Sequence, residues 1–242
     1  MGKMDRFLEL DAFRGLLVFL MIGYHFLFDV DFLVAEIINF QSEAWFWFAR
    51  SIAFFFVLLV GVSLSLHSFR KGLNPFNEKI IQIKKGIFVL GIGFGITIVT
   101  QLFFPGYTIW FGILHFIGIG IIFSIPFVKK PIVSLFLGLG IIILGSVFYS
   151  FLLSFKIMAL FPFSFKTFDY FPLFPWFGVL LVGIFLGGFL YPLGKRRFSF
   201  PFEKNNSLNC LAFVGKNSLL IYLIHQPILV LIVSILFGKW VI

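Results

Sequence analysis

Residues 12–33 read AFRGLLVFLMIGYHFLFDVDFL, an almost continuous apolar run near the start of a chain of 242 residues. A helix needs about 20 mostly apolar residues to cross the roughly 30 Å hydrocarbon core of a bilayer, and this run is long enough. It is too long for the apolar core of a secretory signal, and no small-residue cleavage site follows it. We therefore expect a retained transmembrane helix.

Six further apolar runs follow, separated by short linkers rich in Pro, Gly and basic residues. Backbone groups in lipid must bond within their own segment, so runs of this length predict helices rather than barrel strands. The chain is 60% hydrophobic and 12% charged, which excludes an ordinary soluble enzyme, a disordered chain and a nucleic-acid-binding domain. The sequence predicts an all-α polytopic membrane bundle, forming a single domain over residues 1–242, with about seven transmembrane helices at Ala12–Leu33, Ala44–Leu66, Lys85–Phe104, Ile109–Val128, Ile132–Leu153, Leu173–Leu193 and Leu211–Phe237.

The basic residues predict the orientation of this bundle. Most of them lie before the first run and in every second linker, where cytoplasmic loops carry an excess of Lys and Arg. Only Arg50, Lys156, Lys166 and Lys239 fall on the other side. We therefore expect a multi-pass protein of the cell membrane with a cytoplasmic N-terminus and an extracytoplasmic C-terminus. The residues that set this pattern are Lys3, Arg6, Arg70, Lys71, Lys79, Lys84, Lys85, Lys129, Lys130, Lys195, Arg196, Arg197 and Lys204.

Four polar residues of the first run form a stripe. Asp11, Arg14, His25 and Asp29 all fall on one face, because successive helical residues turn by about 100°. Ionisable groups at membrane depth are costly and are functional candidates by default. We expect Arg14 near the cytoplasmic side, His25 about 16 Å further along the helix, and Asp29 close enough to hold the imidazole and fix its tautomer. Each of these residues also has a structural explanation. Arg14 would extend its side chain to the membrane interface, His25 would be buried with its hydrogen bonds made, and Asp29 would end the helix facing water.

Other polar residues reach a similar depth on other runs. His115 and His225 are candidates to join His25 at one site, and the alternative for each is a hydrogen bond to a backbone or Ser/Thr partner. Arg50 is placed to pair with Asp29 or Glu43, or to bind an anionic acceptor. Lys216, Asn217 and Gln226 add a cation and hydrogen-bonding groups to the last run. Repeated glycines such as Gly183-x-x-x-Gly187 indicate close helix packing, within the chain or in a homo-oligomer.

A cation on the cytoplasmic side and a histidine deep in the membrane favour acyl transfer. Guanidinium recognises phosphate well, so the nucleotide of acyl-CoA would bind near Arg14, assisted by Asp11 and Lys216. Histidine serves as a general base or a transient nucleophile, here with Asp29 as its partner. The acceptor would then be a hydroxyl or amine that approaches from outside.

Several motifs also resemble a known family. The opening pattern of Asp11, Arg14 and Gly15, with His25 following Arg14 after ten residues, is similar to the first helix of the transmembrane acyltransferase superfamily. Five further stretches resemble the heparan-α-glucosaminide N-acetyltransferase catalytic-domain family and its small prokaryotic members. They are YHFLFD (24–29), FFFVLLVGVS (54–63), GILHFIG (112–118), FPLFPWFG (171–178) and GKNSLLIYLIHQP (215–227).

This resemblance implies acetyl-CoA as the donor, a glycan or lipid-linked sugar as the acceptor, an essential first-helix histidine at His25 and no metal. It carries over to Arg14 and His25 by motif position, and to His115, Asn217 and His225 without a defined role. Two other functions fit the intramembrane polar residues. One is a transporter or lipid-handling protein without covalent chemistry. The other is a haem-binding membrane protein with two of the three deep histidines as axial ligands.

Overall fold

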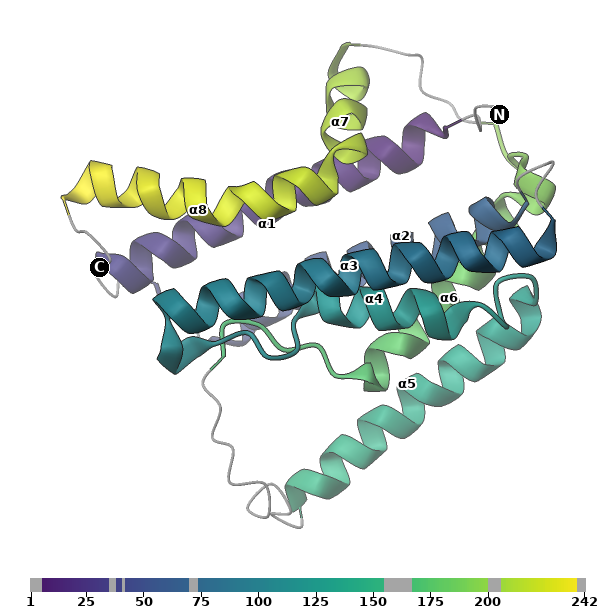
Figure 1. Ribbon diagram of the computed structural model, residues 1–242, viewed down its shortest axis with the longest axis horizontal. Helices are drawn as coiled ribbons and strands as arrows, with labels where there is room; N and C mark the ends of the chain where they lie inside the picture. Colours follow the sequence, from purple (N-terminus) through teal and green to yellow (C-terminus); the bar gives the residue numbers. More distant parts are fainter. Residues whose placement is uncertain are drawn as a thin grey trace. The chain divides into compact units, whose positions relative to one another are not determined.

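The computed structural model describes residues 6–34, 38–40, 42–69, 74–154, 167–199 and 206–238, and these residues are almost entirely helical (Figure 1). Outside the helices, the described residues contain one isolated β-bridge, between Phe111 and Tyr170. The elements are α1 (Leu8–Leu33), α2 (Glu43–Ser68), α3 (Pro75–Phe103), the 3-10 turn η1 (Pro105–Tyr107), α4 (Ile113–Ser124), α5 (Pro131–Ser154), α6 (Leu173–Leu190), the 3-10 turn η3 (Pro192–Gly194), α7 (Asn206–Lys216) and α8 (Ser218–Phe237).

Every predicted apolar run contains a helix, so the all-α membrane architecture is confirmed. Among the described residues, five helices are long and apolar enough to cross a membrane: α1, α2, α3, α6 and α8. Helix α4 has only 12 residues, and Pro131–Gly145 of α5 is a shorter apolar stretch. The chain is thus an integral, multi-pass membrane protein, whereas seven spans and the orientation stay predictions. Lys3, Arg70, Lys71 and Lys204 lie outside the described residues.

Three of the predicted spans have clearly different bounds in the structure. The run at 85–104 is part of a longer helix, α3, which begins ten residues earlier, at Pro75. The run at 109–128 is helical only over α4, because an extended Gly112 starts the helix. The run at 211–237 is divided at Asn217, whose φ of −102° and ψ of 14° interrupt the helix between α7 and α8. The other bounds follow the expected breakers. Asn74 caps α3 by accepting a hydrogen bond from the Phe76 N–H at 3.2 Å, and Pro172 precedes α6.

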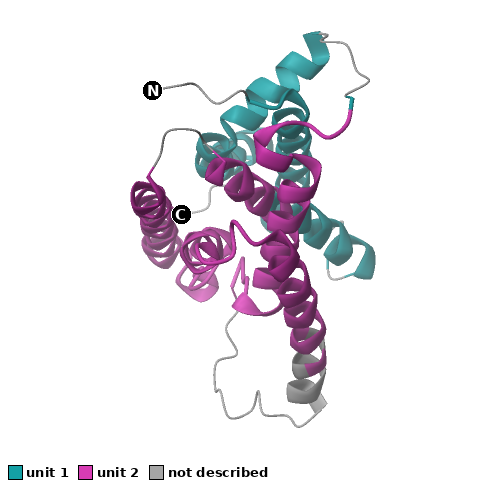
Figure 2. Cartoon of the chain, turned by 90° about the vertical axis from the view of Figure 1, so that its right-hand side faces the viewer, with its two compact units in different colours: residues 1–56, 199–242 teal, residues 57–198 magenta. Residues whose placement is uncertain are grey.

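The chain divides into two compact units (Figure 2). The first comprises residues 1–56 and 199–242, and therefore α1, the first half of α2, α7 and α8. The second comprises residues 57–198. The prediction of a single domain over residues 1–242 stays a prediction.

In the first unit, α1 packs against both α7 and α8, and α8 runs beside α1 in Figure 1. Glycines allow the closest approach. A Cβ atom on Gly15 would overlap the Leu211 carbonyl oxygen, and one on Gly215 would overlap the Asp11 carbonyl oxygen. Two backbones therefore touch here without side chains between them. Further along α1, Tyr24 joins an aromatic group with Phe28, Phe40, Trp45 and Phe48, which brings the start of α2 against α1.

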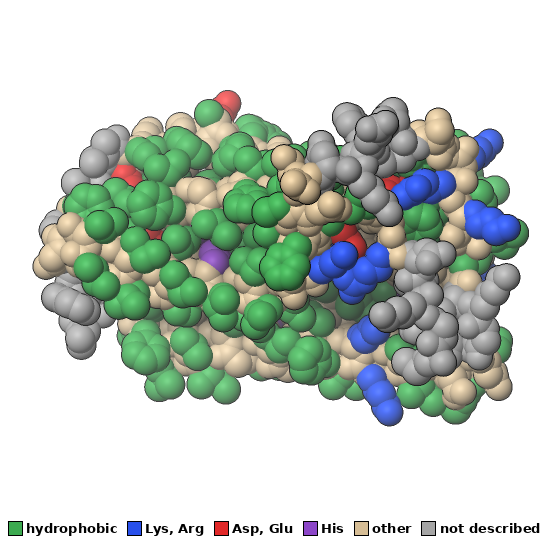
Figure 3. Space-filling view, turned by 90° about the horizontal axis from the view of Figure 1, so that it is seen from above, with side chains coloured by type: hydrophobic (Ala, Val, Ile, Leu, Met, Phe, Trp, Pro, Cys, Tyr) green, Lys and Arg blue, Asp and Glu red, His purple; other side chains and the backbone are tan. Residues whose placement is uncertain are grey.

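In the second unit, α3 packs against α4 and α5 packs against α6. Gly86 and Gly118 bring α3 and α4 together, since a Cβ on Gly86 would lie 2.8 Å from the Gly118 carbonyl oxygen. An ion pair of 2.6 Å joins the largely buried Glu78 of α3 to Lys129. Hydrophobic side chains dominate the face drawn in Figure 3, as expected for helices that contact lipid.

Candidate active site

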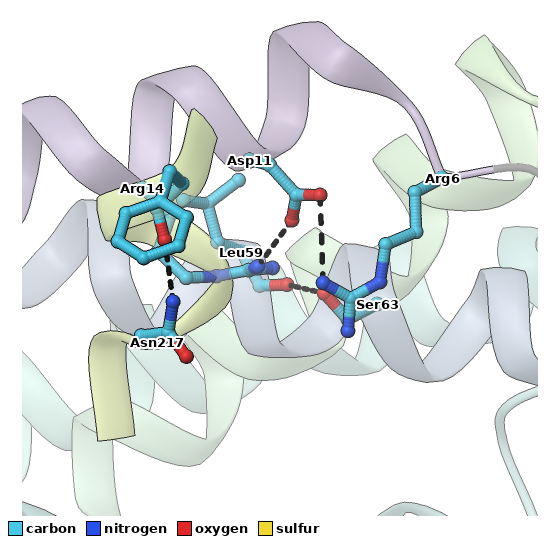
Figure 4. A network of polar contacts seen from close by, with 7 residues as sticks. Arg6, Asp11, Arg14, Leu59, Ser63 and Asn217 are labelled. Carbon is cyan, nitrogen blue, oxygen red and sulfur yellow. Dashed lines mark hydrogen bonds and ion pairs between the residues drawn. The ribbon is translucent and has the colours of Figure 1, made fainter. Parts of the chain in front are cut away.

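The N-terminal part of α1 carries an arginine cluster of Arg6, Asp11 and Arg14 (Figure 4). Arg14 Nη1 donates to Asp11 Oδ1 at 2.9 Å, and Arg6 Nη1 lies 3.9 Å from Asp11 Oδ2. Asp11 is 6% exposed, so the guanidinium groups offset the cost of burying its charge. The Asp11 carboxylate thus lies between two cations, and the role of Asp11 and Arg14 in binding the donor stays a prediction.

The junction between α7 and α8 lies against this cluster. Gly215 contacts the backbone of Asp11 and Gly15, and Lys216 and Asn217 follow directly. Lys216 is exposed, and the Asn217 side-chain amide donates to the Phe213 carbonyl oxygen at 2.9 Å (Figure 4). The structure therefore brings Asp11 and Arg14 together with the chain segment that carries Lys216 and Asn217.

Further along the same two helices lies a histidine cluster of His25, Asp29, His225 and Gln226. The ring centroids of His25 and His225 are 5.0 Å apart, with their planes inclined by 59°. His25 follows Gly15 by ten residues, and His225 follows Gly215 by the same interval. Because α1 and α8 run in the same direction, the contact at the two glycines places the two histidines at the same level. The predicted convergence of His25 and His225 is confirmed.

Asp29 is held by Gln226 rather than by His25. Gln226 Nε2 donates to Asp29 Oδ1 at 2.7 Å, and among the described residues Asp29 Oδ2 has no hydrogen bond. The expected hydrogen bond between Asp29 and the His25 imidazole is therefore wrong, because Oδ1 accepts from the Gln226 amide and Oδ2 accepts from no described residue. The alternative of a water-facing Asp29 is also wrong, since the residue is only 3% exposed.

Replacing Gln226 by Leu should destabilise the protein by about 1–3 kcal/mol, because a buried carboxylate loses its hydrogen-bond donor. Replacing Asp29 alone by Leu should have a cost of the same order, whereas the double variant should cost less than the sum of the two. Thermal unfolding in detergent measures all three. Additive effects would show that the two side chains do not interact in the folded protein.

Arg50 stands on the part of α2 that belongs to the first unit. Its guanidinium carbon lies 5.3 Å from the centroid of the Phe46 ring, a cation–π distance. The described residues contain no ion pair between Arg50 and Asp29, because the hydrogen bond of Asp29 comes from Gln226. The proposed pairing of Arg50 with Asp29 is therefore wrong, and its role toward an anionic acceptor stays a prediction.

His115 belongs to the second unit, where both of its ring nitrogens are engaged. Its Nδ1 accepts from the Gly112 N–H at 3.2 Å, so Nε2 carries the proton and donates to Thr97 Oγ1, also at 3.2 Å. Thr97 donates in turn to the Ile109 carbonyl oxygen at 2.6 Å. The alternative of a backbone and threonine partner is confirmed for His115. Asp169, which the sequence did not single out, completes this helix start by accepting from the Ile113 N–H at 2.9 Å.

The sequence reasoning missed one group of the histidine cluster, the Tyr222 carbonyl oxygen. It lies 2.7 Å from His225 Nδ1. The spacing of Tyr222 and His225, three residues apart on one helix, was the available signal. Within the described ranges, no group of three His, Cys, Asp or Glu residues is placed to hold a metal ion.

Comparison with known proteins identifies the family of the chain. The family model described as "Heparan-alpha-glucosaminide N-acetyltransferase, catalytic" matches residues 6–227, a range that includes both clusters and His115. A search of curated proteins and a search of solved structures found no match. The family consists of membrane acetyltransferases that use acetyl-CoA. Since the match covers nearly all of the 242 residues, the chain belongs to the heparan-α-glucosaminide N-acetyltransferase catalytic-domain family.

Proposed function

We propose that this protein moves an acetyl group from cytosolic acetyl-CoA to a hydroxyl or amine of an extracytoplasmic glycan or lipid-linked sugar. The observation that carries the proposal is the pair of imidazole rings 5.0 Å apart, from α1 and α8, beside the bonded Asp29 and Gln226. Acyl transfer needs a base or nucleophile at the reacting carbon, and histidine supplies either. The protein would work in the cell membrane, in contact with lipid, alone or as a homo-oligomer.

The arginine cluster is the proposed binding site for the donor. Acetyl-CoA carries several phosphates, and guanidinium groups bind phosphate through paired hydrogen bonds. Arg14 is held in place by Asp11, and Lys216 follows the glycine that contacts Asp11. His25 lies about 16 Å beyond Arg14 along α1, a distance that the extended pantetheine arm of the donor is suited to cover.

At the histidine cluster, His25 would act as the base or the transient acyl carrier. As a base, it takes the proton of the acceptor while the acceptor atom bonds to the thioester carbon, and the departing thiolate then receives that proton. As a carrier, an imidazole nitrogen attacks the thioester first and the acceptor displaces the acetyl group afterwards. Both routes end with coenzyme A as a thiol and an acetylated acceptor.

Binding of acetyl-CoA to the detergent-purified protein tests the donor half of the proposal. Calorimetry should detect binding to the wild-type protein, and Arg14→Ala should weaken it, because a hydrogen bond to a charged group contributes about 1.5–3 kcal/mol, or roughly tenfold to a hundredfold in affinity. Arg14→Lys should recover only part of the affinity, since an ammonium lacks the planar fork.

The matched control is Lys130→Ala, which removes an exposed cation from the second unit. It should bind acetyl-CoA as the wild-type protein does. Equal weakening by Lys130→Ala and Arg14→Ala would show that only the overall positive charge attracts the donor. Absence of binding to the wild-type protein would overturn the assignment of acetyl-CoA.

A further inference from the structure

The hydrogen bond to Tyr222 defines the tautomer of His225. A carbonyl oxygen only accepts hydrogen bonds, so the 2.7 Å contact requires the proton on Nδ1. In the neutral ring, Nε2 then carries a free lone pair. His225 is 7% exposed, and Nε2 makes no hydrogen bond within the described part of the chain. The α8 backbone therefore orients a base whose reactive nitrogen is buried and available.

Two other atoms of the histidine cluster are also buried without a hydrogen-bond partner. Asp29 Oδ2 and Gln226 Oε1 are buried, and neither has a hydrogen-bond donor among the residues described. Buried polar atoms are normally hydrogen-bonded, so each such group in a folded protein calls for an explanation. Here all three are acceptors when Asp29 is ionised. A ligand that satisfied them would have to bring hydrogen-bond donors, as a sugar with hydroxyl or amino groups does.

We propose that His225 is a catalytic residue, the general base that removes the proton of the acceptor hydroxyl or amine, while His25 carries the acetyl group. Asp29 and Gln226 position the acceptor through their free oxygens. This inference rests on the proposed acetyltransferase function. It assigns the role of acyl carrier to His25 and the role of general base to His225. His25 makes no hydrogen bond to another described residue that would commit either of its nitrogens, whereas Nδ1 of His225 is committed to Tyr222.

The reaction balances over two steps. A His25 nitrogen bonds to the thioester carbon, the C–S bond breaks, and the thiolate takes the imidazole proton to leave as coenzyme A. The acceptor oxygen or nitrogen then bonds to the acetyl carbon as its proton passes to His225 Nε2, and the bond from the acetyl carbon to His25 breaks. The His225 imidazolium returns the proton to the departing His25 nitrogen, across rings whose centroids lie 5.0 Å apart.

Single-turnover experiments with radiolabelled acetyl-CoA and glucosamine as the probe acceptor test this division. In His225→Asn the amide nitrogen can still donate to the Tyr222 carbonyl, so the helix keeps its hydrogen bond while the base is lost. We expect coenzyme A release to continue and labelled protein to accumulate, with transfer to glucosamine reduced by roughly 10²–10⁴-fold. His25→Ala should show neither label on the protein nor transfer.

Rescue by small molecules distinguishes a chemical role of His225 from a purely structural one. In His225→Ala, added imidazole should restore part of the transfer, whereas pyrazole, which has the same shape but is a far weaker base, should not. Equal rescue by both, or wild-type transfer in His225→Asn, would overturn the role of His225 and leave the acetyltransferase proposal intact. A wild-type protein that neither becomes labelled nor acetylates glucosamine would instead contradict the proposed function.

Nitrogen NMR of the labelled wild-type protein provides a measurement independent of activity. It should show His225 with a protonated Nδ1 and an unprotonated Nε2. A proton on Nε2 of the neutral ring would overturn the inference even if acetyl transfer is observed.

Discussion

Replacing His25 by Ala should abolish acetyl transfer while the protein remains folded. The imidazole lies on α1 beside His225, whose Nδ1 is committed to the Tyr222 carbonyl oxygen. Loss of a general base alone reduces rates by about 10²–10⁴-fold. Loss of an acyl carrier removes the route itself, so the reduction in rate should reach the upper end of that range or exceed it. Transfer of label from acetyl-CoA to glucosamine measures the effect.

The control for this variant is acetyl-CoA binding, which should be unchanged, because Arg14 lies about 16 Å away along α1. His25→Gln, which retains a polar side chain of similar reach without a base, should be as inactive as His25→Ala. A wild-type rate of acetyl transfer in either variant would contradict the proposed catalytic role of His25.

Replacing Gly215 by Ala should give the largest loss of stability. The added Cβ would overlap the Asp11 carbonyl oxygen, a backbone atom that cannot rotate away. Overpacking a core with an extra carbon costs about 1–3 kcal/mol, and a contact with two rigid backbones places this variant at the upper end. Because Asp11 also orients Arg14, acetyl-CoA affinity should fall along with the unfolding temperature.

Gly23→Ala is the matched control, on the same helix and with no atom within 4 Å of the added Cβ. Alanine favours a helix over glycine by about 1 kcal/mol, so this variant should be as stable as the wild-type protein or slightly more so. If Gly215→Ala and Gly23→Ala unfold at the same temperature, the close contact of α1 with α7 does not exist in the membrane protein.

The sequence predicted the helices well, because long apolar runs are the strongest signal that a chain contains. It also predicted the stripe on α1, since residues on one helix keep a fixed angular relation whatever surrounds them. The division at Asn217 was missed because the apolar character of the chain continues on both sides of it. Hydrophobicity indicates which segments form apolar helices, but the hydrophobicity pattern does not change where the backbone angles φ and ψ break a helix locally.

The partners of the polar residues were harder to predict. Asp29 was assigned to His25 because both lie on α1, yet its hydrogen bond comes from Gln226, 197 positions away along the chain. Helical spacing describes neighbours on one helix and says nothing about which side chain a second helix brings. The same holds for His115, whose ring nitrogens form hydrogen bonds with the Gly112 N–H just before α4 and with Thr97 of α3.

The contact at Gly15 and Gly215 has a consequence for how the first unit admits its substrates. At that level the two backbones touch, so a small separation loses the contact altogether. Further along, Asp29 of α1 and Gln226 of α8 are joined by a hydrogen bond between flexible side chains, which can adjust by bond rotation. The contact of α1 with α7 is therefore rigid, whereas α1 and α8 can separate at the level of the histidines, and we expect an acceptor to enter there and not at the glycines.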